Sequence, residues 1–483
     1  MSFKKKYRVA LILFIIVFLL TSCYSSQNNL YDDLMNDIPS TEKDENNIIA
    51  IKNTEKELSG TLTVTTFFDG YINIHAKNFM NAHPNVDIQI IRSDENEFET
   101  LEAYASRMAV ELMNGTATDL VDLSGLDINR YAKSGLLCDL YKFMDKDSTF
   151  DKADYYTNIF EAMEYEKALY AMPFAFLYDM VYVSKPMSEK LNLDLINVDG
   201  INYIEMIDIY EKAKKQHNSP QTFGLMPGAI KESFFNYEII EFYDAKTGTV
   251  RIKSDDFIEH LNLTKSISTE YSPDKGGWYM TRIADGNDDF MKSDFMFSKF
   301  ESNAIDLYNN MIEYKNILEP IPLLNGVGNA PFKTFSSTYA IPQSSQNKEL
   351  AWEFLKYCIS SKNISDFENE EEELKNFMMY QGLIPINIEN FYTSFRHNFI
   401  IEIKRIKEAA FDVKWKSEKE DEMINDTLDK IHNWNLKRNK LVSDFEIWTL
   451  VKQDLQNFYY FNLTTAEETA SIIHNKVLTY LSE

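Results

Sequence analysis

Hydrophobic and polar positions alternate after residue 60 with two different periods. Leu62 and Val64 alternate with polar residues as in a half-buried strand, and Val86, Ile88 and Ile90 repeat this pattern. The segments after these strands show helical stripes: Ile72, Ala76, Phe79 and Met80 in the first, and Leu101, Ala105, Met108 and Leu112 in the second. A short apolar strand, TDLVDLSG, follows. Strand, helix, strand, helix and strand in this order predict an α/β fold with a largely parallel sheet.

The pattern becomes mainly helical from about Lys348. Gly115 is expected to end the second N-terminal helix, because glycine adopts the left-handed conformation of a C-cap. Thr465 and Glu468 form the sequence pattern of a capping box before the last helix. That helix has an apolar stripe of Ala470, Ile473, Val477 and Leu481.

The N-terminus predicts export. Twelve apolar residues, 9–20, follow a basic start, and this run is too short for a membrane span of roughly 20 residues. The segment Leu20-Thr21-Ser22-Cys23 resembles the bacterial lipobox. The resemblance implies cleavage before Cys23 and a diacylglycerol on its sulfur, as part of a stable anchor at the outer face of the cell membrane. An ordinary secretory signal is the alternative.

Composition limits the classes of partner. Residues 24–59 are polar and aperiodic, and predict a flexible tether. The remaining body of about 425 residues is large enough for two lobes. The formal net charge of −26 disfavours nucleic acid as a partner. Cys138 and Cys358 lie among apolar residues, which favours buried free thiols, although a disulfide between them stays open.

Several passages resemble the extracellular solute-binding lipoproteins of ABC importers, family 1. They are GTLTVTTFF with AKNFMNAHPNVDIQII, MAVELMNGTATDLVDLSG, EKALYAMPFAFLYDMVYVSKPMSEKLNL, YAIPQSSQNKELAWEFLKYCIS, QGLIPIN, and the closing stretch from EIWTLVKQDL to the last residue. The resemblance implies a two-lobed periplasmic-binding-protein-like fold of type II with crossing strands. We expect a signal peptide (1–22), a lipidated tether (23–59), one lobe (60–173 with about 290–362) and a second lobe (174–289 with about 363–483).

The resemblance also implies the function. The protein would act as a monomer that captures a small solute, most often a mono- or oligosaccharide, between the lobes and delivers it to ABC permease subunits. No cofactor and no metal are expected. Sugar sites combine aromatic faces with short polar side chains. The candidate ligand contacts are Phe67, Phe68, Asp69, Ser124, Phe174, Tyr178, Trp278, Tyr279 and Trp448.

Trp448 falls where maltodextrin-binding relatives stack a sugar on tryptophan. Other positions depart from those relatives. The chain has Leu123-Ser124-Gly125-Leu126 where they carry an aromatic and an acidic residue, and FSKFES offers Phe300 without a tryptophan. These departures argue against maltodextrin itself and leave other saccharides, or another solute, open.

Two other classes compete with an importer component. A surface enzyme acting on saccharides would need paired carboxylates, but 75 acidic residues make some pair inevitable. The sequence contains no HExxH, GxSxG, Walker or GxGxxG motif, and its histidines lack metal-ligand spacing. The acidic loop 145–154 departs from the EF-hand pattern for calcium. A tethered structural or adhesive protein would favour repeats or sandwich patterning, which the α/β alternation opposes.

Overall fold

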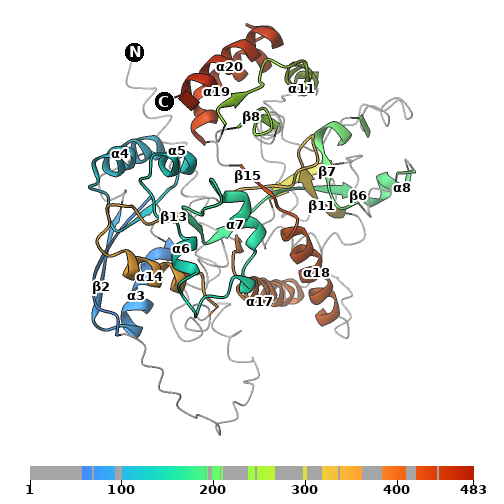
Figure 1. Cartoon of the computed structure of the whole chain (residues 1–483). Coiled ribbons are helices and arrows are strands. Elements are labelled where there is room, and N and C mark those ends of the chain that lie inside the picture. The colour runs from blue at the N-terminus through green and yellow to red at the C-terminus, as the bar shows by residue number, and fades with distance from the viewer. Residues whose placement is uncertain are drawn as a thin grey trace, which may run out of the picture. The chain divides into compact units, whose positions relative to one another are not determined.

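In the computed structural model, a mixed five-stranded sheet combines strands from both halves of the chain (Figure 1). The structure describes residues 57–67, 70–92, 100–190, 192–193, 198–206, 208–209, 238–244, 247–266, 297–301, 318–334, 338–361, 383–408, 420–442 and 445–482. The strand order is β2 (Val86–Arg92), β1 (Gly60–Thr66), β3 (Leu120–Asp122), β13 (Thr338–Ala340) and β4 (Met172–Pro173). Strand β1 is parallel to β2 and β3, whereas β13 runs antiparallel to β3 and β4.

The sequence pattern explains this sheet. Leu62 and Val64 are fully buried, and the helices α3 (Gly70–Ala82) and α4 (Leu101–Asn114) follow β1 and β2 along the chain. Phe79 of α3 packs edge-to-face against Phe354 of α14 (Lys348–Ile359), with ring centroids 5.4 Å apart. Burial of one phenylalanine side chain stabilises the folded state by about 2 kcal/mol. The predicted α/β alternation is confirmed.

A second sheet has the order β10 (Phe297–Glu301), β6 (Asp179–Ser184), β11 (Leu318–Leu324) and β7 (Ile201–Asn202). Strands β10 and β11 flank β6 on either side, both antiparallel to it. Strand β7 is parallel to β11. The two strands that pair with β6 therefore follow it in the chain by more than 100 residues.

Three two-stranded pairs and further helices complete the described residues. The pairs are β12 (Pro331–Phe332) with β15 (Lys440–Leu441), β14 (Ile384–Pro385) with β5 (Ala175–Phe176), and β8 (Tyr243–Asp244) with β9 (Thr249–Val250). The helices are α5 (Ile128–Lys133), α6 (Tyr141–Met144), η2 (Lys152–Asp154), α7 (Thr157–Met163), α8 (Lys185–Lys190), α11 (Asp255–Ser266), α17 (Ile388–Glu408), α18 (Glu420–Asn435), α19 (Phe445–Tyr459) and α20 (Ala466–Ser482).

Many of the buried side chains in the described ranges belong to two large hydrophobic cores. The first core contains the five-stranded sheet and helices α3, α4, α14, α17 and α18. The second core joins α11, α19 and α20 to the β8–β9 hairpin. Cys138 and Cys358 are buried free thiols, as their apolar neighbours favour.

Both predicted helix caps are present. Gly115 ends α4 with φ 67°, and its N–H donates to the backbone carbonyls of α4. Thr465 Oγ1 accepts the N–H of Glu468, whose carboxylate accepts the N–H of Thr465 in return. Ala470, Ile473 and Val477 of the predicted stripe are fully buried.

Candidate functional site

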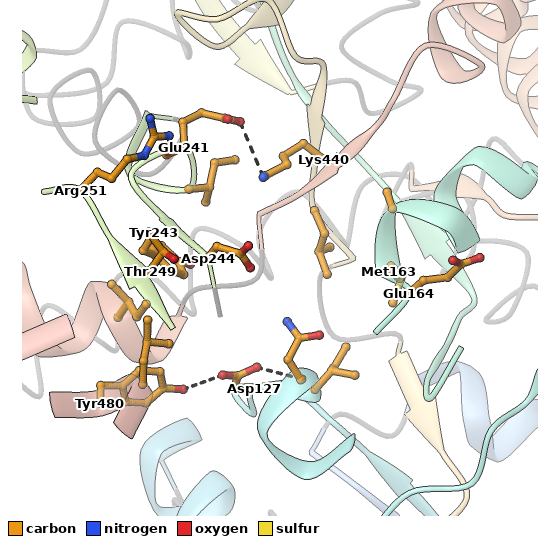
Figure 2. Close-up of a pocket in the computed structure, with 17 residues that line it drawn as sticks. Asp127, Met163, Glu164, Glu241, Tyr243, Asp244, Thr249, Arg251, Lys440 and Tyr480 are labelled. Carbon is orange, nitrogen blue, oxygen red and sulfur yellow. Dashed lines mark hydrogen bonds and ion pairs between the residues drawn. The ribbon is translucent and has the colours of Figure 1, made fainter. Parts of the chain in front are cut away.

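A cavity of about 330 Å³ lies among residues of several elements (Figure 2). The start of α5, the end of α7, the β8–β9 hairpin, β15, α19 and α20 all contribute to its lining. The lining residues are Asp127, Ile128, Asn129, Ala162, Met163, Glu164, Ile240, Glu241, Tyr243, Asp244, Thr249, Arg251, Lys440, Leu441, Ile447, Tyr480 and Leu481. Residues of both hydrophobic cores therefore line the cavity.

Asp127 joins the cavity to helix α5. Its Oδ1 accepts the backbone N–H of Asn129 at 2.9 Å, which makes Asp127 the N-cap of the helix. Its Oδ2 accepts the hydroxyl of Tyr480 from α20 at 3.1 Å (Figure 2). The guanidinium of Arg130 lies 5.9 Å from the centre of the Tyr480 ring. One carboxylate therefore connects α5 to α20.

Glu241 forms another part of the lining. Its Oε1 accepts the side-chain amides of Asn325 at 2.7 Å and Asn329 at 2.8 Å. Lys440 Nζ lies 3.9 Å from the same oxygen, and Arg251 donates to the backbone carbonyl of Glu241 at 2.6 Å. These contacts fix the carboxylate between the turn after β11 and strand β15.

Glu238 precedes Glu241 by three residues and does not itself line the cavity. It is buried, and its Oε1 accepts the N–H of Gly326 at 2.7 Å. Its Oε2 lies 4.0 Å from Nε2 of His260. Burial raises the pKa of Glu238 to about 7, although the Gly326 hydrogen bond opposes the shift. A Cβ at residue 326 would lie 2.8 Å from Oε2 of Glu238, so glycine allows this approach without a shift of the Glu238 side chain.

Two predicted ligand residues, Phe67 and Ser124, contact the buried carboxylate of Asp122. This carboxylate accepts the N–H of Phe67 at 3.0 Å, and both the N–H and hydroxyl of Ser124 at 2.9 and 2.6 Å. Burial raises the pKa of Asp122 to about 6 in spite of these hydrogen bonds. Asp122 thereby fixes the backbone at the carboxyl ends of β1 and β3, where parallel sheets bind ligands.

Phe174 belongs to the same neighbourhood. Its ring stacks on Tyr339 of β13, with centroids 4.9 Å apart. The hydroxyl of Tyr339 lies 2.9 Å from Oγ1 of Thr66, the last residue of β1. Phe67 packs 5.2 Å from the ring of Tyr104. We call Phe67, Asp122, Ser124, Phe174 and Tyr339 the strand-end cluster; Ser124 lies three residues before Asp127 of the cavity.

The other predicted site residues lie apart from this cluster or outside the described residues. Tyr178 is fully buried beneath Arg438, whose guanidinium lies 4.5 Å from the ring centre. Trp448 is half-buried in α19, packed against the second core and 5.9 Å from Lys452 Nζ. The residues outside the described ranges are Cys23, Phe68, Asp69, Trp278 and Tyr279.

None of the cavity residues is among the site residues predicted from the sequence. Asp127 carried a signal, because aspartate before a helix predicts an N-cap, but its contact with Tyr480 spans 353 positions. In the described ranges no group of three or more His, Cys, Asp or Glu side chains could hold a metal ion. None of the helices found there is long and apolar enough to cross a membrane.

Comparison with solved structures defines the fold class. The chain is similar to an extracellular solute-binding protein family 1 from Alicyclobacillus acidocaldarius (13% identity, TM-score 0.54, covering 89% of this chain and 100% of that one). It is also similar to the sugar-binding protein MalE from Xanthomonas citri (13%, 0.58, 88% and 98%). A third similar structure is an ABC substrate-binding protein from Listeria monocytogenes in complex with cycloalternan (13%, 0.51, 88% and 99%). The fold is therefore that of two-lobed periplasmic binding proteins.

The family follows from the sequence. Residues 68–364, more than half of the chain, match the model of the bacterial extracellular solute-binding proteins, and the chain belongs to this family. A search of curated proteins found no match. Solute-binding proteins of this family and fold are not enzymes, which confirms the expectation for this chain.

Proposed function

We propose that this protein is the extracytoplasmic component of an ABC importer and that its solute is a carbohydrate bound in the cavity. The observation that carries the proposal is the lining: tyrosines, carboxylates, the Asn129 amide and two cations converge on a volume of about 330 Å³. Small-molecule sites typically begin near 300 Å³ and combine apolar surface with a few fixed polar groups. Two similar structures are described as a sugar-binding protein and as a complex with cycloalternan.

The strand-end cluster would extend the binding surface. Phe67 and Phe174 offer aromatic faces, and Ser124 offers a hydroxyl held by Asp122. The loop from Ser124 to Asp127 links this cluster to the cavity. We keep as proposed contacts Phe67, Phe68, Asp69, Ser124, Phe174, Tyr178, Trp278, Tyr279 and Trp448.

A two-lobed fold supplies the mechanism. A solute that contacts both lobes stabilises the closed state through its greater affinity for that state. The permease would then distinguish a closed, loaded protein from an open, empty one. We propose that the first lobe is built on the five-stranded sheet and the second on the four-stranded sheet, with α19 and α20 contributing to the site. The lobe boundaries expected from the sequence stay a prediction.

We also propose a lipid anchor on Cys23, supported by the lipobox-like LTSC segment after the apolar run. Cells expressing the protein would be labelled with a palmitate analogue and fractionated. The wild-type chain should be labelled and sediment with membranes, whereas Cys23→Ser should lose the label. Equal labelling of both chains would overturn the anchor at this residue.

Thermal unfolding tests solute binding. The full-length protein in detergent would be heated with mono- and oligosaccharides, amino acids and peptides. A ligand at 100 times its dissociation constant adds about 2.7 kcal/mol, which raises the melting temperature of a body this size by a few degrees. A shift from one saccharide class supports the proposal. A shift caused only by an amino acid or peptide would contradict the proposal that the solute is a carbohydrate.

A further inference from the structure

Glu241 and Lys440 form a charged pair in the wall of the cavity (Figure 2). Lys440 Nζ lies 3.9 Å from Oε1 of Glu241. This distance suits an ion pair but exceeds that of an N–H···O hydrogen bond, about 2.7–3.2 Å. Both side chains keep part of their surface exposed, 16% for Glu241 and 37% for Lys440, so the pair can contact a molecule in the cavity.

The two carboxylate oxygens of Glu241 have different surroundings. Oε1 accepts the side-chain amides of Asn325 at 2.7 Å and Asn329 at 2.8 Å, and Lys440 lies beside the same oxygen. Within the described part of the chain, no residue donates a hydrogen bond to Oε2. Each carboxylate oxygen offers about two acceptor sites. The two amides therefore occupy Oε1 and leave Oε2 for a ligand.

The turn between β11 and β12, residues 325–330, fixes Glu241; we call it the asparagine turn. Asn325 is fully buried, and its Oδ1 accepts the N–H of Asn329 at 2.8 Å while its amide group donates to Glu241. The backbone N–H of Asn325 also donates to the carbonyl of Asn329 at 3.0 Å. Because the turn is closed by its own hydrogen bonds, its two amide groups hold Glu241 from a rigid support.

Strand β15, which carries Lys440, is joined to the asparagine turn. Asn439 Oδ1 accepts the N–H of Ala330 at 2.9 Å, and the N–H of Asn439 donates to the Ala330 carbonyl at 3.1 Å. Pro331 of β12 is paired with Lys440 in the parallel register that follows. One turn therefore positions both members of the charged pair, although they are far apart in the sequence.

A hydroxyl group matches this arrangement. It is both a donor and an acceptor, so one hydroxyl can donate to Oε2 of Glu241 and accept from Nζ of Lys440. Hydrogen bonds to charged groups contribute more than those between neutral groups. A ligand that lacks the hydroxyl would leave both charged groups without a partner in a cavity from which it has displaced water.

We propose that Glu241 and Lys440 together bind one hydroxyl group of the saccharide. Asn325 and Asn329 are positioning residues that hold Glu241 for this contact. The inference rests on the proposed function, because it names the group of the sugar that the same cavity selects.

Titration calorimetry of the full-length protein in detergent tests the contact. The probes are glucose, galactose, mannose, maltose, cellobiose and lactose, each with its monodeoxy and monodeoxyfluoro derivatives. For the parent sugar that binds best, removal of the selected hydroxyl should weaken binding at least about tenfold. Fluorine at that position should not restore the affinity, because fluorine cannot donate to Glu241. The ratio of the parent affinity to the monodeoxy affinity measures recognition of each hydroxyl.

Two variants each remove one partner of the hydroxyl. Glu241→Gln can still accept both asparagine amides but presents a donor in place of Oε2, and Lys440→Met keeps a long unbranched side chain, so both should fold. Each should bring the affinity ratio close to one, and for the same hydroxyl. The matched control is the exposed pair of Asp145 and Lys152, 2.9 Å apart and outside the lining. Asp145→Asn and Lys152→Met should leave every ratio unchanged.

Asn329→Ala tests the positioning role. A variant that was only less stable would bind the parent and monodeoxy sugars less tightly by the same factor, whereas loss of positioning lowers the ratio between them. A wild-type ratio in Asn329→Ala would overturn the positioning role. Unchanged ratios in Glu241→Gln or Lys440→Met, or no discrimination by the wild-type protein, would overturn the inference and leave the proposed function intact. Failure of every sugar to bind the wild-type protein would refute both.

Discussion

Tyr480, near the C-terminal end of α20, donates its hydroxyl to Asp127, the N-cap of α5, at a distance of 3.1 Å. Tyr480 packs with the second hydrophobic core, whereas Ile128 beside Asp127 belongs to the first. The hydrogen bond therefore connects the two cores at the cavity that we propose as the solute site.

Removing this hydroxyl should weaken the folded state modestly. Tyr480→Phe keeps the ring near Arg130 but deprives Asp127 of one donor, and should lower the free energy of unfolding by about 0.5–1.5 kcal/mol. Urea unfolding checks the value. Tyr392→Phe is the matched control, because Tyr392 donates to Asp429 at an exposed site and should cost less. An equal effect of both substitutions would contradict the connecting role of Tyr480.

Asp122 should be far more important for stability than an exposed aspartate. Asp122→Ala leaves the donors of Phe67, Ser124 and Thr66 without their common acceptor. We expect a loss of about 3 kcal/mol. Asp421→Ala, exposed in the first turn of α18, should change stability by well under 1 kcal/mol. Denaturant unfolding measures both losses. Similar losses in the two variants would contradict the claim that the hydrogen bonds to Asp122 stabilise the fold.

Glu238 should make stability depend on pH. Its folded pKa of about 7 lies above the ordinary value of 4.5, so the folded state binds the proton more tightly than the unfolded state. Its contribution is complete below about pH 4.5 and is lost as pH rises through about 7. Asp122, with a pKa of about 6, acts in the same direction.

Comparison with Glu238→Gln isolates this contribution. Glutamine can still accept the Gly326 N–H but does not ionise. Between pH 5 and pH 8 the wild-type protein should lose up to about 3 kcal/mol relative to the variant. Urea unfolding at both pH values measures the difference. A wild-type protein that gains stability relative to the variant at higher pH would show that the pKa is not raised.

The capping box of α20 gives a local test. Thr465→Ala removes the acceptor for the Glu468 N–H and should cost about 1 kcal/mol. Thr479→Ala, exposed near the end of the same helix, should leave stability unchanged or raise it by a few tenths of a kcal/mol, because alanine favours the helix more than threonine does. If both substitutions had the same effect on the free energy of unfolding, the cap would not stabilise the helix.

The sequence predicted local structure well and long-range structure poorly. The period of Leu62 and Val64, the glycine C-cap and the Thr465–Glu468 box depend on neighbours in sequence, and the structure confirms them. Met108 and Leu112 of the stripe predicted for α4 are buried. Tyr104, which is not part of that stripe, is the third buried residue of this helix. The ring of Tyr104 packs in the first core, and its buried hydroxyl is satisfied because it donates to the Asp122 carbonyl.

The site depended on pairings that no local pattern encodes. Strand β6 pairs with β10 and β11 across more than 100 residues, and Asp127 meets Tyr480 across 353. Aromatic loop residues were therefore visible as candidates, whereas the carboxylates of the cavity were not. The charge of a cavity can be read only from the folded structure, because its lining comes from segments that are far apart in the sequence.

A cavity-filling substitution tests the central claim most directly. Ala162 lines the cavity at the end of α7, and Ala162→Phe should occupy the solute volume. Ala109→Phe on α4, also partly buried against the first core, is the matched control. Titration calorimetry with the saccharide that binds best should show saturable binding for the wild-type protein and the control, and at least about tenfold weaker binding for Ala162→Phe. Undiminished binding by a folded Ala162→Phe variant would contradict the assignment of this cavity as the solute site.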